Sequence, residues 1–234
     1  MFKLLSRVIS IVLLSTAVFF VGGEVAAKSS LDNTLDLTDQ GPSDNRQTSI
    51  KGARDIAFGK FSQEFRDFIS DVATGQDGVI TGIFAYDVLA MDVAQQPAAS
   101  PGYISTNEDV VTEFGMARDY GTIGMLAHNY LAGETFFDLE TGQAVYLVFG
   151  DGSIQKYTIV DILSYQALQP NSPYSNFLNL DNSGEYLTAS DLFYKVYGLE
   201  DSLILQTCIE NQGVESWGRL FVVAVPGDAT GESG

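Results

Sequence analysis

Apolar residues recur along the chain with two different periods. Between residues 55 and 72, large apolar side chains stand at i, i+4, i+7, i+8 and i+11: Phe61, Phe65, Phe68, Ile69 and Val72. This spacing predicts an amphipathic helix over Asp55–Val72, whose apolar stripe packs against a core. From Gly78 onward, short apolar runs between turn residues predict strands instead.

The predicted strands share β-branched and aromatic residues, and together they favour a mainly β fold. A second helix is expected to begin at Thr188 with a capping-box pattern and to end at Gly198. Residues 107–118 are expected to hold a short helix capped by Asn107, and residues 167–180 a long loop. Gly150–Gly152 predicts a hairpin turn. The expected strands are 79–93 (one strand or a pair, with Gly82 at a bulge), Gly121–His128, Ala144–Phe149, Ile154–Ser164, Ser202–Cys208 and Arg219–Val225. Seven or eight strands with two short helices predict a barrel or a sandwich.

The N-terminus has the pattern of an export signal. Two basic residues precede an uncharged apolar run, and small residues follow up to Ala27, which predicts a signal peptide over residues 1–27. An uncleaved membrane anchor is the alternative, and it would be the only contact with a membrane. Residues 28–50 are polar and predict a spacer, residues 51–226 the folded domain, and residues 227–234 a disordered tail. The sequence therefore predicts an extracytoplasmic protein, secreted or tethered to the cell surface.

Charge and cysteine content narrow the function classes. The chain has 12 Lys or Arg against 30 Asp or Glu, a formal net charge of −18. So negative a surface repels phosphate backbones, which argues against nucleic acid as a partner. An exported domain stabilised by disulfides uses cysteines in pairs, whereas this chain has one cysteine. Cys208 is therefore a buried inert thiol, a site for an intermolecular bridge, or a nucleophile.

The segment around Cys208 carries the candidate chemistry. If Ser202–Cys208 and Arg219–Val225 pair as a hairpin joined by a loop over residues 209–218, Arg219 returns beside Cys208. A guanidinium favours the thiolate and can face an oxyanion. His128, the one histidine of the chain, can then act as general acid. Taken singly, each residue has an ordinary structural role as its alternative: a buried thiol, a surface histidine, an arginine at a strand edge.

The residues also resemble a known family, the sortases, which are cell-surface cysteine transpeptidases. The resemblance rests on Leu126–Asn129, on Leu205-Gln206-Thr207-Cys208 and on Arg219–Val223, and it spans about Gly78–Val225. It implies a sortase-like eight-stranded β-barrel with one or two short helices. It also implies that Cys208 forms a thioacyl enzyme with a peptide carrying a sorting motif, and that His128 protonates the leaving amine. Arg219, with backbone N–H groups near Thr207, would stabilise the oxyanion, and an amine or water would accept the acyl group.

The sequence leaves two other functions open and contains part of a calcium-binding pattern. Ala127 stands where the family usually has glycine, which leaves open a non-catalytic sortase-fold module that binds or supports other molecules. An unrelated secreted β-barrel is the third reading. Residues 179–184 have half the pattern of a calcium loop, but the twelfth position is Ser190 and not Glu. Calcium is thus unsupported, and no cofactor is predicted.

Overall fold

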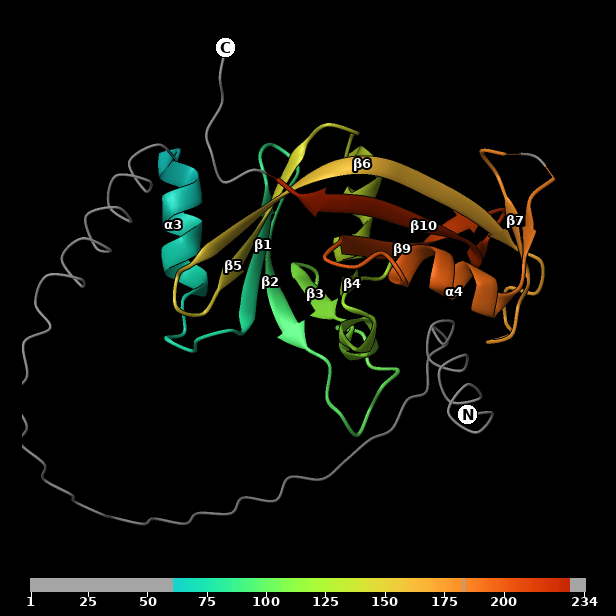
Figure 1. Ribbon diagram of the computed structural model, residues 1–234, viewed down its shortest axis with the longest axis horizontal. Helices are drawn as coiled ribbons and strands as arrows, with labels where there is room; N and C mark the ends of the chain where they lie inside the picture. The colour runs from blue at the N-terminus through green and yellow to red at the C-terminus, as the bar shows by residue number, and fades with distance from the viewer. Residues whose placement is uncertain (1–60, 183, 228–234) are drawn as a thin grey trace, which may run out of the picture. The chain divides into compact units, whose positions relative to one another are not determined.

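The computed structural model describes residues 61–182 and 184–227, and residues from Asp67 onward form one compact unit. Its helices and strands follow one another along the chain as shown in Figure 1. Two of the helical segments, η1 and η2, are 3₁₀ helices. The elements are α3 (Gln63–Val72), β1 (Ile80–Ala85), β2 (Leu89–Gln95), β3 (Val110–Glu113), η1 (Gly115–Tyr120), β4 (Ile123–Leu126), η2 (Ala132–Asp138), β5 (Ala144–Phe149), β6 (Ile154–Ala167), β7 (Phe177–Asn179), β8 (Tyr186–Leu187), α4 (Ala189–Tyr197), β9 (Leu203–Asn211) and β10 (Val214–Pro226).

The strands close into a barrel. They form one sheet in the order β10-β9-β4-β3-β2-β1-β5-β6-β7-β8, and β10 also pairs with β6. This last pairing joins the two ends of an eight-stranded ring, and β7 and β8 extend the sheet beyond it. Closure removes the exposed edges of the ring, where unpaired backbone groups would otherwise remain. The predicted mainly β fold with an eight-stranded barrel is confirmed.

Apolar side chains gather on both sides of the ring. One cluster fills the barrel interior and includes Leu147, Leu205 and Val222; a second lies on the outer face and includes Ile204 and Phe221. Helix α4 covers the second cluster, with Phe193 and three other side chains buried there (Figure 1). Strands β9 and β10 are therefore buried on both faces, unlike strands with one face in water.

Several local predictions are confirmed. Helix α3 ends at Val72, as predicted. The predicted start of this helix, Asp55, lies outside the described residues. Residues 79–93 form the strand pair β1 and β2, with a register shift beside Gly82. Helix α4 has the predicted capping box, in which Thr188 and Asp191 each accept from the backbone N–H of the other. The signal peptide, the spacer and most of the tail lie outside the described residues.

Three local predictions were wrong. Residues 107–118 do not form one helix capped by Asn107; they hold strand β3 and the start of η1. The β-branched residues 110–112 are extended because they pair in parallel with β2. The predicted loop over 167–180 contains β7, which extends the sheet from β6. The predicted loop 209–218 is mostly strand, since β9 and β10 run on to a tight turn at Gln212 and Gly213, both with positive φ.

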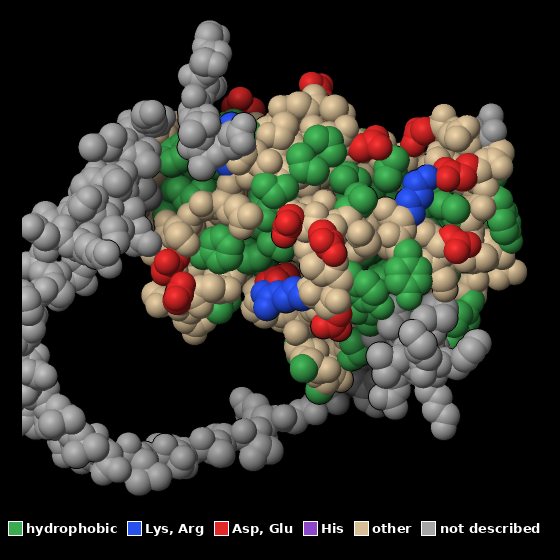
Figure 2. Space-filling view, viewed as in Figure 1, with side chains coloured by type: hydrophobic (Ala, Val, Ile, Leu, Met, Phe, Trp, Pro, Cys, Tyr) green, Lys and Arg blue, Asp and Glu red, His purple; other side chains and the backbone are tan. Residues whose placement is uncertain are grey.

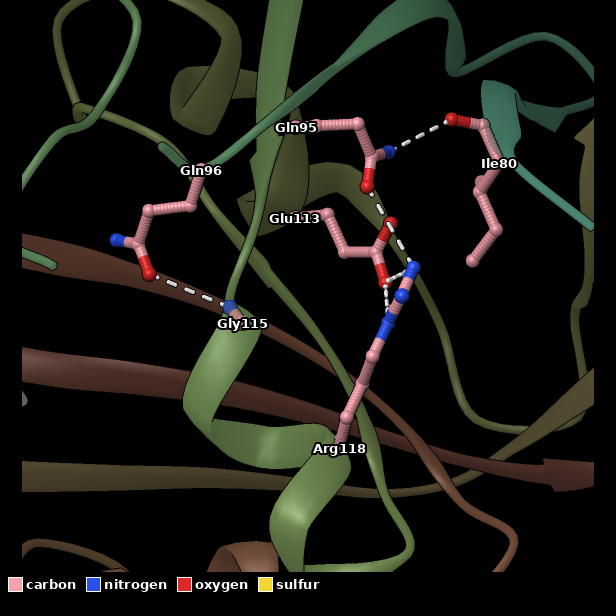
Figure 3. Close-up of polar contacts among 6 residues, drawn as sticks. All are labelled: Ile80, Gln95, Gln96, Glu113, Gly115 and Arg118. Carbon is pink, nitrogen blue, oxygen red and sulfur yellow. Dashed lines mark hydrogen bonds and ion pairs between the residues drawn. The ribbon is translucent and has the colours of Figure 1, made fainter. Parts of the chain in front are cut away.

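A polar cluster fastens η1 to strands β2 and β3 (Figure 3). Glu113 is 1% exposed, and its Oε1 accepts a hydrogen bond from Arg118 Nε at 2.5 Å. Gln95 lies between this pair and β1, since its Nε2 donates to the carbonyl oxygen of Ile80 at 3.0 Å. Gln96 accepts from the N–H of Gly115 at 3.2 Å. The cluster gives a buried carboxylate the cation that such a group requires.

Among the described residues, no helix has the length and apolar character needed to cross a membrane.

Candidate functional site

Two of the three candidate residues lie on neighbouring strands, and the third, His128, follows the end of β4 by two residues. Cys208 on β9 and Arg219 on β10 are direct partners in the antiparallel ladder. Strand β4 flanks β9 on the other side, in parallel, with Leu126 level with Gln206. This is the last pair of the ladder, and His128 comes two residues later. The end of β4, Cys208 and Arg219 therefore form a row across three neighbouring strands.

Cys208 and Arg219 also share one face of the sheet. Side chains alternate between faces along a strand, so Cys208 follows Ile204 and Arg219 follows Phe221. Ile204, Phe221 and Leu126 all belong to the outer cluster under α4, and His128 follows Leu126 by two residues. The row thus runs along the outer face, not the barrel interior. The sequence placed all three residues at strand ends. Cys208 and Arg219 instead lie within strands, because the hairpin continues past them. The strand predicted to end at His128 ends at Leu126, and the carbonyl of His128 already belongs to the following turn.

Thr207 faces the opposite way and ties β9 to the chain before His128. Its Oγ1 donates to the carbonyl oxygen of Ala127 at 3.0 Å, and the N–H of Ala127 donates to the carbonyl oxygen of Gln206 at 3.2 Å. The parallel ladder therefore continues past the end of β4, up to the residue before the histidine. Thr207 is 2% exposed, so this hydrogen bond is shielded from water and contributes to holding the row in place.

Arg219 is fixed by the backbone of its own strand. Its Nη1 donates to the carbonyl oxygens of Ser216 at 3.0 Å and Gly218 at 2.7 Å. The side chain is buried, as is that of Cys208, with exposed fractions of 2% and 9%. A guanidinium held in this way costs little further ordering if it meets a developing negative charge.

His128 is the half-buried member of the row. Burial lowers the pKa of its imidazole, and the negative charge of Glu215 opposes this by raising the pKa. Its ring stacks on that of Tyr130, with centroids 5.3 Å apart and the planes inclined by 22°. The sequence analysis missed both neighbours, because an exposed tyrosine and one glutamate among 30 acidic residues carry no motif.

Among the described residues, no group of three or more His, Cys, Asp or Glu side chains could hold a metal ion. The segment that resembled part of a calcium loop instead uses its side chains internally. Asn179 accepts from the N–H groups of Asp181 and Asn182 and donates to Glu185, which also pairs with Lys195.

The chain matches no protein-family model and no curated protein sequence. Solved sortase structures are among those to which it is similar. Sortase A from Corynebacterium diphtheriae is 13% identical, with 80% of this chain and 86% of that chain covered and a TM-score of 0.43. Sortase C1 from Streptococcus suis is 11% identical, with 85% and 93% covered and a TM-score of 0.42. Sortase E1 from Streptomyces coelicolor, solved with a tripeptide in its active site, is 18% identical, with 67% and 91% covered and a TM-score of 0.40.

Proposed function

We propose that this protein is a sortase-like cysteine transpeptidase or peptidase that cleaves a peptide through a thioacyl-enzyme intermediate. The observation that carries the proposal is the row across three adjacent strands, in which Cys208 has Arg219 as its ladder partner and the end of β4 on its other side. A nucleophilic thiol needs a neighbouring cation or base and a proton donor for the leaving group. Arg219 and His128 would supply these groups.

The reaction follows from these positions. The thiolate of Cys208 attacks the carbonyl carbon of a substrate peptide bond, and negative charge develops on the carbonyl oxygen. The carbon–nitrogen bond then breaks, the leaving amine takes a proton from His128, and a thioester remains. An incoming amine, or water, attacks the thioester while His128 takes a proton from it, and the thiol is restored.

Arg219 would stabilise the oxyanion. Its Nη1 is occupied by two backbone carbonyls. Among the described residues, no other nitrogen of the Arg219 guanidinium has a hydrogen-bond acceptor, so its remaining N–H groups would be the ones to meet the oxyanion. Preorganised donors of this kind contribute the most where water is excluded.

The setting of the reaction belongs to the same proposal. The N-terminal pattern would export the protein, so the substrate would be an extracytoplasmic peptide or protein with a sorting motif. The acyl acceptor would be an amine at the cell surface, or water. The anchor or signal itself would be the only membrane contact.

A non-catalytic sortase-fold module is the second candidate. The burial of Cys208 and Arg219 favours it, because an enclosed thiol beside a backbone-bound arginine can serve packing alone. The two candidates differ in the chemical behaviour of one sulfur atom.

Alkylation of Cys208 against pH separates them, and the single cysteine makes labelling specific to this site. We expect the folded protein to react with iodoacetamide at neutral pH. His128→Ala should slow the reaction at least about tenfold, since the thiol loses the group that accepts its proton and less thiolate forms. Cys208→Ala provides the unlabelled control. Urea then exposes the thiol in every cysteine-containing variant.

The two candidates predict opposite patterns. A thiol that reacts only after unfolding, or that ignores His128, would establish the non-catalytic module. A thiol that reacts rapidly and depends on His128 would support the enzyme, and mass spectrometry with a peptide library would then identify the thioacyl adduct.

A further inference from the structure

The turn after β4 folds Tyr130 back over the imidazole. The carbonyl oxygen of His128 accepts hydrogen bonds from the N–H groups of Leu131 and Gly133, both at 3.0 Å. These bonds hold the chain in a tight turn, and the ring of Tyr130 lies against that of His128. One face of the imidazole is thereby covered by an aromatic ring, which attracts a cation more than a neutral group.

The β9–β10 hairpin reaches the same turn. Asn129 donates from Nδ2 to the carbonyl oxygen of Glu215 at 3.3 Å. Glu215 lies where the ladder register shifts between Val214 and Gly218, and Arg219 binds the carbonyls of Ser216 and Gly218 within that irregular segment. The segment is therefore held at the backbone of Glu215 and at two later carbonyls, which brings Glu215 against the residue that follows the histidine.

Several charged or titratable groups lie on the elements packed around His128. Glu215 and Arg219 are on β10, Cys208 is on β9, and Glu134 is on η2. Burial shifts the pKa of His128 downward, and Glu215 is the charged group that shifts it upward. Burial disfavours the charged form of an imidazole, whereas a nearby carboxylate favours it.

We infer that Glu215 is a positioning residue for His128, because its backbone is hydrogen-bonded to Asn129, the residue that follows the histidine. In this role its carboxylate favours the imidazolium form that the acid step requires. The inference rests on the proposed function, in which His128 protonates the leaving amine. Glu215 acts through the imidazole and does not touch the substrate. The Tyr130 ring supports the same charged form by stacking on the imidazole, and the Asn129 hydrogen bond holds the backbone of Glu215.

The titration of His128 tests this inference directly. The chain has one histidine, so in an untagged protein the imidazole resonances in an NMR titration belong to His128 alone. We expect Glu215→Gln to lower the midpoint by about half a pH unit, the size expected for one screened charge near a surface. The matched control is Glu210→Gln, which removes one charge from the same hairpin and keeps an oxygen to accept from Gly213; its midpoint should stay that of the wild type.

Salt separates an electrostatic role from a structural one. Raising NaCl from 0.05 to about 1 M should shrink the difference between wild type and Glu215→Gln, because salt screens exposed charges. A shift independent of salt would mean a structural effect and would overturn the inference.

Equal midpoints in wild type and Glu215→Gln, or an equal shift in Glu210→Gln, would also overturn it. Failure of the proposed function looks different, because the NMR titration needs no turnover. A midpoint that depends on Glu215 in a protein whose thiol never reacts would reject the enzyme while the charge coupling stands.

Discussion

Gly133 lies between the turn that follows His128 and the side chain of Thr207 on β9. It is the second residue of η2, and its N–H donates to the carbonyl oxygen of His128. A side chain added there would clash with the side chain of Thr207 and lie 2.8 Å from that same carbonyl oxygen. Only glycine lets η2 approach β9 this closely, so the turn that carries His128 depends on the absence of one methyl group.

We expect Gly133→Ala to lower the free energy of unfolding by about 1–3 kcal/mol, as overpacking does elsewhere in well-packed interiors. The alkylation of Cys208 should slow as well, because η2 must move away from Thr207. Urea unfolding measures the first effect and iodoacetamide labelling the second. In Gly102→Ala the added methyl meets nothing within 4 Å, so this variant should stay within about 0.5 kcal/mol of wild type. Equal stability of the two variants would mean that η2 gives way freely.

The sequence could predict part of this site. That Cys208 and Arg219 are neighbours could be predicted, because two apolar runs indicated a hairpin. The hairpin forms and pairs the two residues. Glu215 could not be found, since it is one of 30 acidic residues and its position depends on a register shift that no local pattern encodes. The role of Gly133 was equally hidden, because its contact lies 74 residues away along the chain.

Among the elements, η1 depends on one buried charge. Glu113, at the end of β3, is nearly inaccessible, and the carboxylate oxygen Oε2 has no hydrogen-bond partner among the described residues. Arg118 on η1 supplies the cation, with 52% of its own side chain exposed. The pair therefore joins a strand end to a 3₁₀ helix, which has few hydrogen bonds of its own to stabilise it.

We expect Arg118→Gln to destabilise the protein by about 2 kcal/mol. Removing one member of a buried pair leaves an uncompensated charge, and the exposure of Arg118 makes the loss smaller than for a fully buried pair. The double variant Glu113→Gln/Arg118→Gln should recover at least half of this loss, because no buried charge then remains. A double variant that is as unstable as the two single variants added together would show that the charges do not act on each other.

Element prediction succeeded where the pattern was local. The capping box of α4 was readable because all of its atoms lie within four residues of Thr188. Strand β3 was missed because it is extended only through its parallel pairing with β2. A long connection separates the two strands, so no local pattern indicates the pairing. The short strand β7 was missed for the same reason, as it exists only by pairing with the end of β6.

At the scale of the whole molecule, a closed barrel carries a large excess of negative charge. Asp and Glu side chains are spread over the face shown in Figure 2, with Lys and Arg at only a few points. The formal net charge is −18 at pH 7, and the sequence pI is about 4.1. Folding concentrates these like charges on one surface, and their mutual repulsion opposes the compact state. Closure of the sheet through β6 and β10 must offset that repulsion.

Salt should therefore stabilise the protein at neutral pH. We expect the midpoint of thermal unfolding to rise by roughly 2–4 °C between 0.01 and 0.3 M NaCl, which corresponds to about 1 kcal/mol in a domain of this size. The internal control is the same comparison near pH 4, where the net charge is close to zero and screening has little repulsion to relieve. If the midpoint rises equally at both pH values, salt acts on apolar burial and the acidic surface places no strain on the barrel. A rise confined to neutral pH would show that the charge which argues against nucleic acid also lowers the stability of the fold.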